Sequence, residues 1–291
     1  MKAKTYLILF LLLLVTTSMK KHNPAYTLFD QKGKEVTYQD LIKAASEAEI
    51  VLFGELHNNP ISHWLQYELT CDLHELHGQQ LILAAEMFEA DNQLLLDEYI
   101  SGTIRQRNFE DEAKLWNNYE TDYKPLVEFA RENKLTFVAG NIPRRYAAIV
   151  HQRGFEGLNE LPDEAKKFIA PLPVAYDPEL PGYKSMLEMM SGMGTGPASE
   201  NLPKAQAVKD ATMAYFILKN LKPGTVLIHY HGTYHSNNYE GIYWYLKKQN
   251  PDLKILTIAS VEQEEIDSLT SENSALADFT ICVPTTMTKT H

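Results

Sequence analysis

The amino-acid sequence predicts an α/β fold, with a largely parallel sheet covered by helices on both faces. Short apolar runs alternate with segments of helical periodicity along most of the chain, which is the pattern of parallel sheets. These runs, such as Ile50–Phe53 and Leu81–Ala85, are apolar at every position rather than at every second one, as strands buried on both faces are. The alternation stops between residues 161 and 203, which indicates an insertion into the α/β domain.

The first half of the chain is expected to open with a β-hairpin and to continue with alternating strands and helices. Segments 26–29 and 35–37 flank the turn Asp30–Gly33, which is typical of a hairpin. After the strand Ile50–Phe53, Asn59-Pro60 has the sequence of a helix N-terminus. The apolar face of that helix comprises Ile61, Leu65, Leu69, Leu73 and Leu76. We then expect a strand at Leu81–Ala85, helices at Asn92–Ile100 and Tyr123–Asn133, a strand at Thr136–Ala139 and a helix that begins near Pro143.

The second half contains the insertion and then returns to the alternating pattern. Seven prolines and four glycines fall between residues 161 and 203, which predicts a helical, Pro/Gly-rich insertion over the sheet. Methionines at helical spacing within it either pack against the domain or form an apolar wall for a flat aromatic ligand. These are Met186, Met189, Met190 and Met193. We then expect a helix at Lys204–Leu221, a strand at Val226–Ile228, a helix at Tyr239–Gln249, and strands at Ile255–Ala259 and Phe279–Val283.

The N-terminal residues have the pattern of a secretory signal. Lys2 and Lys4 precede the apolar run Tyr6–Val15, and the small polar residues 16–18 follow it. The run is short for a membrane span, so we expect a signal peptide at 1–18 and an exported domain at 19–291. An uncleaved apolar tail is the alternative. The expected location is the periplasm or cell envelope. There is no cysteine near residue 18 to accept a lipid, so the sequence does not predict a lipoprotein.

The charge of the chain argues against nucleic acid as a partner. Lys and Arg number 27 and Asp and Glu number 38, for a net charge of −11. No basic cluster offsets this excess of acidic residues, so the chain has no electrostatic means of holding a phosphate backbone. The only two cysteines, Cys71 and Cys282, allow either one disulfide or two buried thiols.

Polar residues follow several of the predicted strands. Glu55 and His57 belong to the motif Gly54–His57, which comes directly after the strand Ile50–Phe53, and a second motif, Gly232–His235, has the same Gly-x-x-His spacing. Glycine allows a sharp turn, and parallel sheets bind ligands at the carboxyl ends of their strands. Glu86, Asn141, His229 and His231 also stand at or just past predicted strand ends. The sequence therefore predicts one polar site assembled from distant segments.

Carboxylates and imidazoles together are typical ligands of a divalent metal such as Zn, Mn or Fe. The expected metal ligands are Glu55, His57, Glu86 and His235. Each residue alone also has a structural interpretation. Glu55 can cap a helix, and Glu86 can pair with Arg144 or Arg145. His229 can be a hydrogen-bonded core residue. The convergence of the whole group on strand ends favours a functional site.

Five motifs occur in one order along the chain: Gly54–Asn59, Glu86-Met87-Phe88, Gly140–Arg144, Ala205–Ala214 and His231–His235. In these motifs and their order the chain resembles the ChaN-like family of haem-binding proteins, which belongs to a superfamily with the Tiki metalloproteases and the erythromycin esterases. The resemblance extends from about Tyr26 to Val283. It implies an envelope protein linked to iron uptake, which binds haem through a tyrosine, forms a homodimer around two haems and works with outer-membrane uptake components.

The resemblance does not identify the haem-ligating tyrosine. Tyr176, Tyr183, Tyr234 and Tyr239 are candidates, and Tyr183 is preferred because it neighbours the methionine face. The expected haem-binding residues are Tyr183, Met186 and Met190. A phenolate is a hard ligand that favours ferric iron.

Two functions remain open at this point. The first is an exported protein that binds haem or a related iron compound. The second is a metal-dependent hydrolase, a Tiki-like peptidase or an esterase. In that enzyme Glu55 or Glu86 is the general base for a water on a metal held by His57 and His235.

Overall fold

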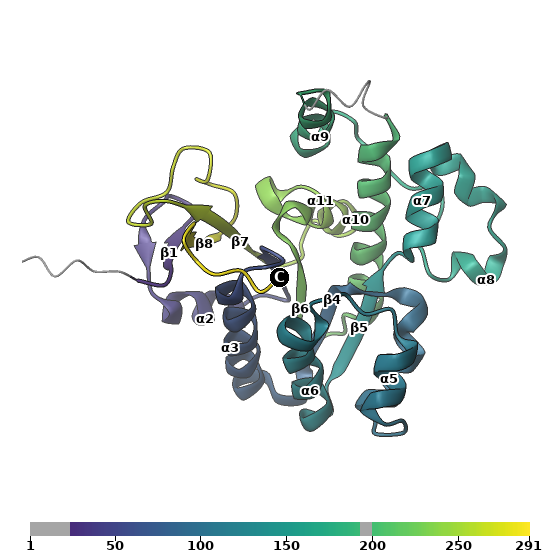
Figure 1. Ribbon diagram of the computed structural model, residues 1–291, viewed down its shortest axis with the longest axis horizontal. Helices are drawn as coiled ribbons and strands as arrows, with labels where there is room; N and C mark the ends of the chain where they lie inside the picture. The colour runs from purple at the N-terminus through teal and green to yellow at the C-terminus, as the bar shows by residue number, and fades with distance from the viewer. Residues whose placement is uncertain (1–23, 193–199) are drawn as a thin grey trace, which may run out of the picture.

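The computed structural model describes residues 24–192 and 200–291, which form an α/β fold around one eight-stranded sheet (Figure 1). The strand order is β2-β1-β8-β7-β3-β6-β4-β5. The strands from β3 to β8 pair in parallel, whereas β1 is antiparallel to β2 and β8. Their bounds are β1 Thr27–Asp30, β2 Glu35–Val36, β3 Ile50–Glu55, β4 Leu81–Glu89, β5 Thr136–Asn141, β6 Val226–Gly232, β7 Ile255–Gln263 and β8 Phe279–Pro284. The predicted fold class is confirmed, and the predicted signal peptide at 1–18 lies outside the described residues.

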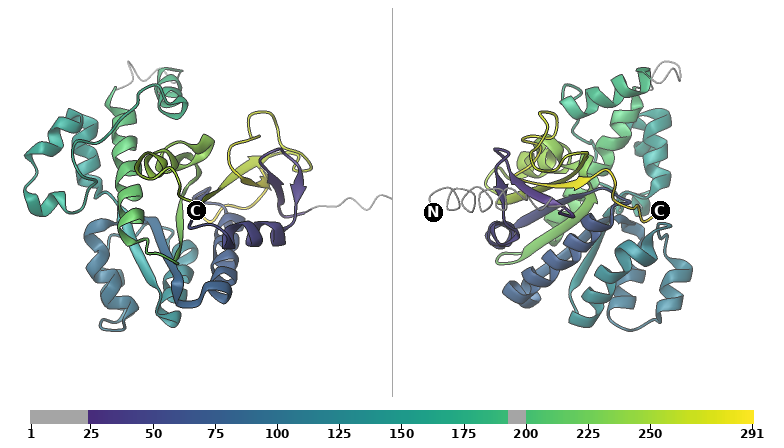
Figure 2. Two further views of the ribbon diagram at one scale, coloured as in Figure 1. Left: turned by 180° about the vertical axis from the view of Figure 1, so that it is seen from behind. Right: turned by 60° about the vertical axis from the view of Figure 1, so that its left-hand side comes forward.

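Helices cover both faces of the sheet, as the two views in Figure 2 show. One face carries α2 (Tyr38–Ser46), α3 (Pro60–His77), α4 (Gln93–Ile100), α5 (Gln106–Glu112) and α6 (Lys124–Asn133). The other face carries α10 (Asn201–Asn220) and α11 (Ile242–Gln249), and α7 (Arg144–Arg153) packs on α10.

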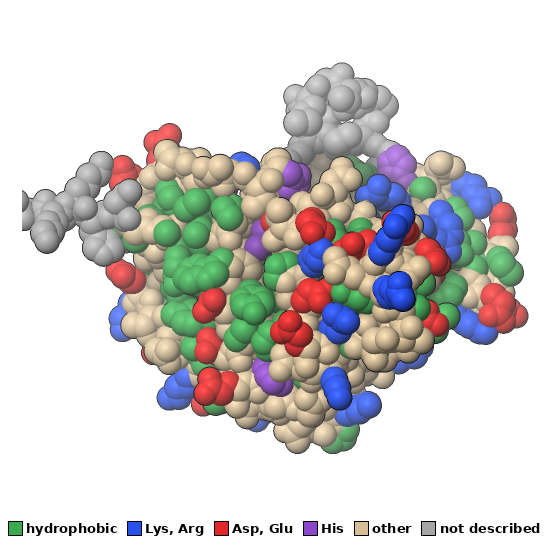
Figure 3. All heavy atoms as spheres, turned by 60° about the horizontal axis from the view of Figure 1, so that its bottom comes forward, with side chains coloured by type: hydrophobic (Ala, Val, Ile, Leu, Met, Phe, Trp, Pro, Cys, Tyr) green, Lys and Arg blue, Asp and Glu red, His purple; other side chains and the backbone are tan. Residues whose placement is uncertain are grey.

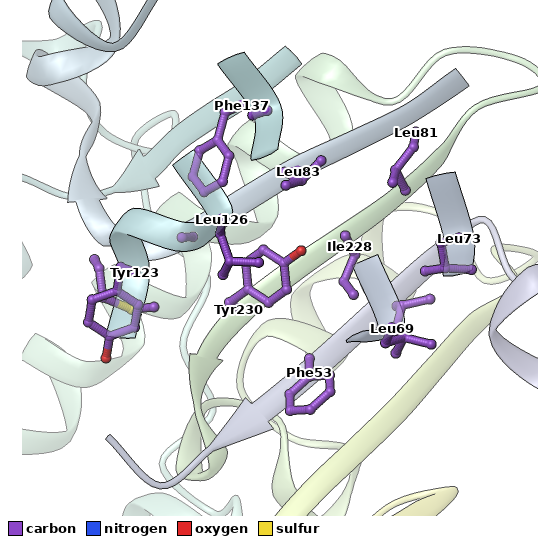
Figure 4. Packing of buried hydrophobic residues seen from close by; sticks show 14 of the residues in the cluster. Phe53, Leu69, Leu73, Leu81, Leu83, Tyr123, Leu126, Phe137, Ile228 and Tyr230 are labelled. Atoms are coloured by element: carbon purple, nitrogen blue, oxygen red, sulfur yellow. The ribbon is translucent and has the colours of Figure 1, made fainter. Parts of the chain in front are cut away.

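Alternate residues of a central strand pack against opposite faces of the sheet. In β3, Val51 and Phe53 pack in one apolar cluster, whereas Ile50 and Leu52 pack in the other. Figure 4 shows the first cluster, in which Phe53 of β3 lies near Leu69 of α3. Because neither face meets solvent, the first four positions of β3, Ile50 to Phe53, are all apolar, and burial of each such side chain contributes about 1.5–3 kcal/mol.

Helix α3 begins where the sequence predicts but buries less of its apolar face. The side-chain oxygen of Asn59 accepts hydrogen bonds from the backbone N–H groups of Ile61 and Ser62, at 3.0 and 3.2 Å. Leu65, Leu69 and Leu73 are buried, but Leu76 is 58% exposed, so its assignment to the buried face is wrong. An 18-residue helix is about 27 Å long, whereas the six-residue strand β3 spans about 20 Å. The last turn of α3 therefore extends past the strand.

The connections after β3 and β6 leave the sheet toward opposite faces. The chain after β3 enters α3 on one face, and the chain after β6 enters α11 on the other. The two strands are neighbours, with Glu55 paired to Gly232 at their carboxyl ends. This divergence opens a crevice between adjacent strands, which is where open α/β sheets bind ligands.

The predicted insertion contains two helices and an irregular segment between them. Helix α8 (Asp163–Lys166) packs with α7 and α10 through Ala165, and Ile169 in the segment after α8 joins the same cluster. Helix α9 (Pro181–Gly192) stands beside one end of α10 (Figure 1). Among the predicted methionines, Met186 lies in the described part of α9, whereas the side chains of Met189 and Met190 and all of Met193 lie outside it.

Three further findings bear on the expectations from composition. Cys71 and Cys282 are both free thiols, and burial raises the pKa of the Cys282 thiol to about 11. On the face shown in Figure 3, basic side chains are interspersed with acidic ones. In the part of the chain that the structure describes, no helix has the length and apolarity needed to cross a membrane.

Candidate functional site

The two Gly-x-x-His motifs meet in the crevice between β3 and β6. Neither glycine makes a turn, because Gly54 and Gly232 lie inside their strands and neither has a positive φ. Both are needed for close approach instead. A Cβ on Gly54 would lie 2.8 Å from the carbonyl oxygen of Ile258, and one on Gly232 would lie 2.7 Å from Nε2 of His57. His57 therefore packs directly on the end of β6.

Glu55 is the buried anchor of the β3 half of the site. Its Oε1 accepts hydrogen bonds from Nδ1 of His57 at 2.8 Å and from the hydroxyl of Tyr123 at 2.6 Å. Its Oε2 accepts a hydrogen bond from Nε2 of Gln66 at 2.5 Å. Burial would raise the pKa of Glu55, but the hydrogen bond from His57 and the nearby His63 outweigh burial and lower it. Burial likewise opposes protonation of His57, and Glu55 reverses that effect and raises the pKa of His57.

A second ring of polar groups fixes the loop that carries His57. The backbone oxygen of His57 lies 3.0 Å from Nε2 of His63 and accepts a hydrogen bond from Nδ2 of Asn118 at 3.0 Å. Asn118 also donates to Oδ2 of Asp122 at 2.7 Å. None of these partners was predicted from the sequence, although polar side chains beside the apolar face of α3, such as His63 and Gln66, were a signal that could have revealed them.

Glu86 and His235 form the β6 half of the site. Residue pairing between β4 and β6 ends at Ala85, and the β4–β5 register shifts after it, so Glu86 is the first residue beyond the regular pairing. One carboxylate oxygen of Glu86 accepts a hydrogen bond from the backbone N–H of Gly232 at 2.8 Å, and the other lies 3.2 Å from Nε2 of His235.

Asp210 completes this half from α10. Its Oδ1 lies 2.5 Å from Nδ1 of His235, and its Oδ2 accepts a hydrogen bond from the hydroxyl of Tyr183 at 3.0 Å. Burial would lower the pKa of His235, but the carboxylates of Glu86 and Asp210 outweigh burial and raise it to about 10. His235 also holds the pKa of Glu86 well below its usual range against the opposite effect of burial. This half is therefore a buried imidazolium between two carboxylates.

His229 lies inside β6, three residues before its last residue, which corrects the expectation from sequence, whereas His231 is the next-to-last residue of the strand. Their Nδ1 atoms are 3.0 Å apart, and Nε2 of His231 lies 2.9 Å from the hydroxyl oxygen of Ser236. Burial and repulsion from His235 lower the pKa of His231 to about 3, and burial lowers that of His229 well below 6.5. Both imidazole rings are therefore neutral and are buried in the interior of the protein next to the site.

The other predicted polar residues have structural partners. Asn141 donates from Nδ2 to the backbone oxygen of Glu86 at 2.9 Å. Arg145 pairs with Asp91 at 2.6 Å rather than with Glu86. The structure thus brings Glu55, His57, Glu86 and His235 to one crevice, as predicted. Across residues 24–192 and 200–291, however, no group of three or more His, Cys, Asp or Glu side chains is arranged to hold a metal ion.

A cavity of about 760 Å³ opens at this crevice, and we call it the crevice cavity. His57, Glu86 and His235 line it, and α9 and α10 contribute Tyr183, Met186, Gln206 and Lys209. Tyr234 lines the cavity with 75% of its surface exposed. Leu56, Val261 and Leu276 add apolar surface. The volume is within the range of about 300–1,000 Å³ that is common for small-molecule sites.

Comparison with known proteins gives one family and a shared fold. The family model described as "Haem-binding uptake, Tiki superfamily, ChaN" matches residues 41–246. The structure is similar to ChaN of Campylobacter jejuni, with a TM-score of 0.68 and 20% identity over 89% of this chain and 97% of that one. A mutant of the erythromycin esterase EreC has a TM-score of 0.47 and 12% identity over 88% of this chain and 83% of its own.

One curated relative comes from a plant. RETICULATA-RELATED 5, a chloroplastic protein of Arabidopsis thaliana, is 25% identical over an alignment of 207 residues, and the match covers 66% of this chain. The chain spans about a quarter of the length of that relative, since the match covers 27% of it.

Proposed function

Since this chain belongs to the ChaN family of haem-binding uptake proteins in the Tiki superfamily, we propose that it binds haem in the crevice cavity. We further propose that it does so outside the cytoplasm, in the acquisition of haem or iron. The observation that carries this proposal is an exposed phenol beside an open cavity with mixed polar and apolar walls.

The residues of the cavity fit a flat, largely apolar macrocycle with an iron at its centre. Met186 of α9 and Leu276, which precedes β8, are partly buried and both line the cavity. A thioether such as that of Met186 adapts well to an aromatic surface. Haem, when bound, would supply an iron, and a tyrosine oxygen is a known protein ligand of haem iron.

Tyr234 is better suited to the ligand role than Tyr183. The phenol of Tyr183 is buried and donates its hydrogen bond to Asp210, and burial together with that carboxylate raises its pKa far above the usual value. Ferric iron prefers a phenolate, so ligation by Tyr183 would place a second negative charge beside Asp210. The hydroxyl of Tyr234, by contrast, has no hydrogen-bond partner among the residues that the structure describes. We therefore assign the ligand role to Tyr234, with Met186 as part of the apolar wall.

Titration with ferric haem, followed by absorbance in the Soret region, tests the proposal. The wild-type chain is expected to give a saturable, high-spin spectrum. Tyr234→Phe should weaken binding by at least about tenfold and change the spectrum, because it removes the ligand oxygen. Tyr183→Phe is the matched control and should retain the wild-type spectrum. Loss of the spectrum in Tyr183→Phe alone would return the ligand role to Tyr183, and no saturable spectrum in the wild type would contradict haem binding.

Assembly and location are further parts of the proposal. ChaN of Campylobacter jejuni is described as binding haem cofacially, and Tyr234 is exposed on the surface of this chain. We propose that a second copy of the chain covers this face, so that haem promotes a homodimer, and that outer-membrane uptake components are its partners. Light scattering with and without haem tests the dimer. N-terminal sequencing of protein from the native host tests removal of residues 1–18.

Hydrolysis is the second candidate function, and the two polar halves of the crevice support it. The side chain of His57 is 41% exposed and is oriented by the buried Glu55, which is the arrangement of a general base. Incubation with ester and peptide substrates, with and without added Zn²⁺ or Mn²⁺, tests this function. Turnover that His57→Ala abolishes, in a protein without a saturable haem spectrum, would favour the hydrolase.

A further inference from the structure

The crevice cavity contains one lysine with no assigned task. Lys209 is the one Lys or Arg side chain among the described residues that line it. No ion pair or hydrogen bond joins its ammonium to another residue in the described part of the chain. The residue is partly buried on α10. Because this ammonium lines the cavity and has no partner in the described protein, it is free to bind an anionic group of a ligand.

Four of the acidic residues that line the cavity, Glu86, Asp210, Glu240 and Glu262, already have partners in the protein. Glu86 and Asp210 share His235. Glu240 accepts a hydrogen bond from the backbone N–H of Gly182 at 2.7 Å, and Glu262 forms an ion pair with Lys289. Among these lining carboxylates, each negative charge is thus met by protein groups, whereas the positive charge of Lys209 is not.

The position of Lys209 on α10 places its side chain at the crevice cavity. It lies three residues after Gln206, whose Nε2 is 2.9 Å from Nδ1 of His235, and both residues line the cavity. Residues three apart share a helix face. Asp210 follows Lys209 directly, and consecutive side chains on a helix do not face each other, which is why that carboxylate bonds to His235 and Tyr183 instead.

We propose that Lys209 binds a carboxylate of the ligand in the crevice cavity, and for haem this carboxylate is a propionate. The inference rests on the proposed function, because it identifies the part of that ligand which the lysine recognises. A charge-assisted hydrogen bond from an ammonium to a carboxylate is stronger than one between neutral groups. Because Lys209 is the one Lys or Arg side chain in the described lining, it also sets the orientation in which an anionic ligand enters.

The test compares ferric haem with its dimethyl ester, in which both propionates are methylated, in the same co-solvent. Lys209→Ala should weaken binding of haem by about tenfold or more, since a hydrogen bond to a charged group is lost. The same variant should bind the dimethyl ester as the wild type does. Lys209→Arg should retain most of the affinity for haem. Lys219→Ala, a change on the same helix where the lysine lies over the rings of Tyr215 and Phe216, is the matched control.

The outcomes separate this inference from the haem proposal. If the wild type binds haem and Lys209→Ala binds it equally well, Lys209 does not hold the carboxylate. An equal loss of affinity for haem and for the dimethyl ester would also overturn the inference, because the lysine would then act on the shape of the cavity. If the wild type shows no saturable spectrum with either ligand, haem binding itself fails and the assignment fails with it.

Discussion

The two Gly-x-x-His motifs have the same spacing and neighbouring positions, yet they produce different histidines. The side chain of His57 is 41% exposed and has one carboxylate partner, Glu55. The side chain of His235 is 6% exposed and lies between Glu86 and Asp210. The spacing of a motif therefore predicts where a histidine lies, whereas the burial and charge contributed by other segments decide what it can do. His57 is available to a ligand or substrate, and His235 holds the site together.

The largest expected effect is on stability and concerns the β6 half. His235→Ala leaves Glu86 and Asp210 buried without their shared cation, so the free energy of unfolding should fall by about 3–5 kcal/mol. His57→Ala is the matched change in the β3 half. Glu55 keeps its hydrogen bonds from Gln66 and Tyr123, so the loss should be about 1 kcal/mol. Chemical denaturation of both variants measures the difference, and equal losses would contradict the distinction between the two histidines.

A smaller effect is expected from filling the space between the two halves. Gly232→Ala places a Cβ 2.7 Å from Nε2 of His57 and should cost about 1–3 kcal/mol of stability, as overpacking does. It should also weaken haem binding, because His57 must move. Gly140→Ala is the control, since a Cβ there meets Phe216 at an ordinary 3.5 Å. A wild-type affinity in Gly232→Ala would show that the position of His57 does not matter to the ligand.

Stability should also depend on pH, and the sign of the dependence distinguishes His231 of β6 from His235, which follows that strand. The pKa of His231 is lowered to about 3 in the folded chain. In the unfolded chain His231 therefore binds a proton near pH 6.5, whereas in the folded chain it stays neutral at that pH. Stability should therefore fall by about 1.4 kcal/mol per pH unit below pH 6.5 for this group. The pKa of His235 is raised to about 10, so its contribution is complete below pH 6.5 and is lost as pH rises toward 10.

Denaturation curves between pH 5 and 10 measure both trends. In His231→Asn the acid-side slope should decrease, and in His235→Ala the alkaline-side loss should disappear. Unchanged slopes in both variants would contradict the assigned protonation states.

The sequence predicted the strands well, because strands buried on both faces must be apolar at each position and so stand out along the chain. The convergence of Glu55, His57, Glu86 and His235 followed from their places near strand ends. Asp210 and Tyr123 escaped prediction as site residues because they reach the crevice from helices, where a single polar residue resembles an exposed one. The role of Gly54 and Gly232 was also missed, since close approach between strands depends on tertiary contacts that a glycine in a sequence does not reveal.

The central claim is that haem binds in the crevice cavity through Tyr234. A crystal structure of the ferric haem complex, with the iron located from its anomalous scattering, tests the claim most directly. We predict an iron peak within coordination distance of the Tyr234 hydroxyl oxygen, with Met186 against the ring. An iron bound at Tyr183, or haem bound outside the crevice cavity, would contradict it.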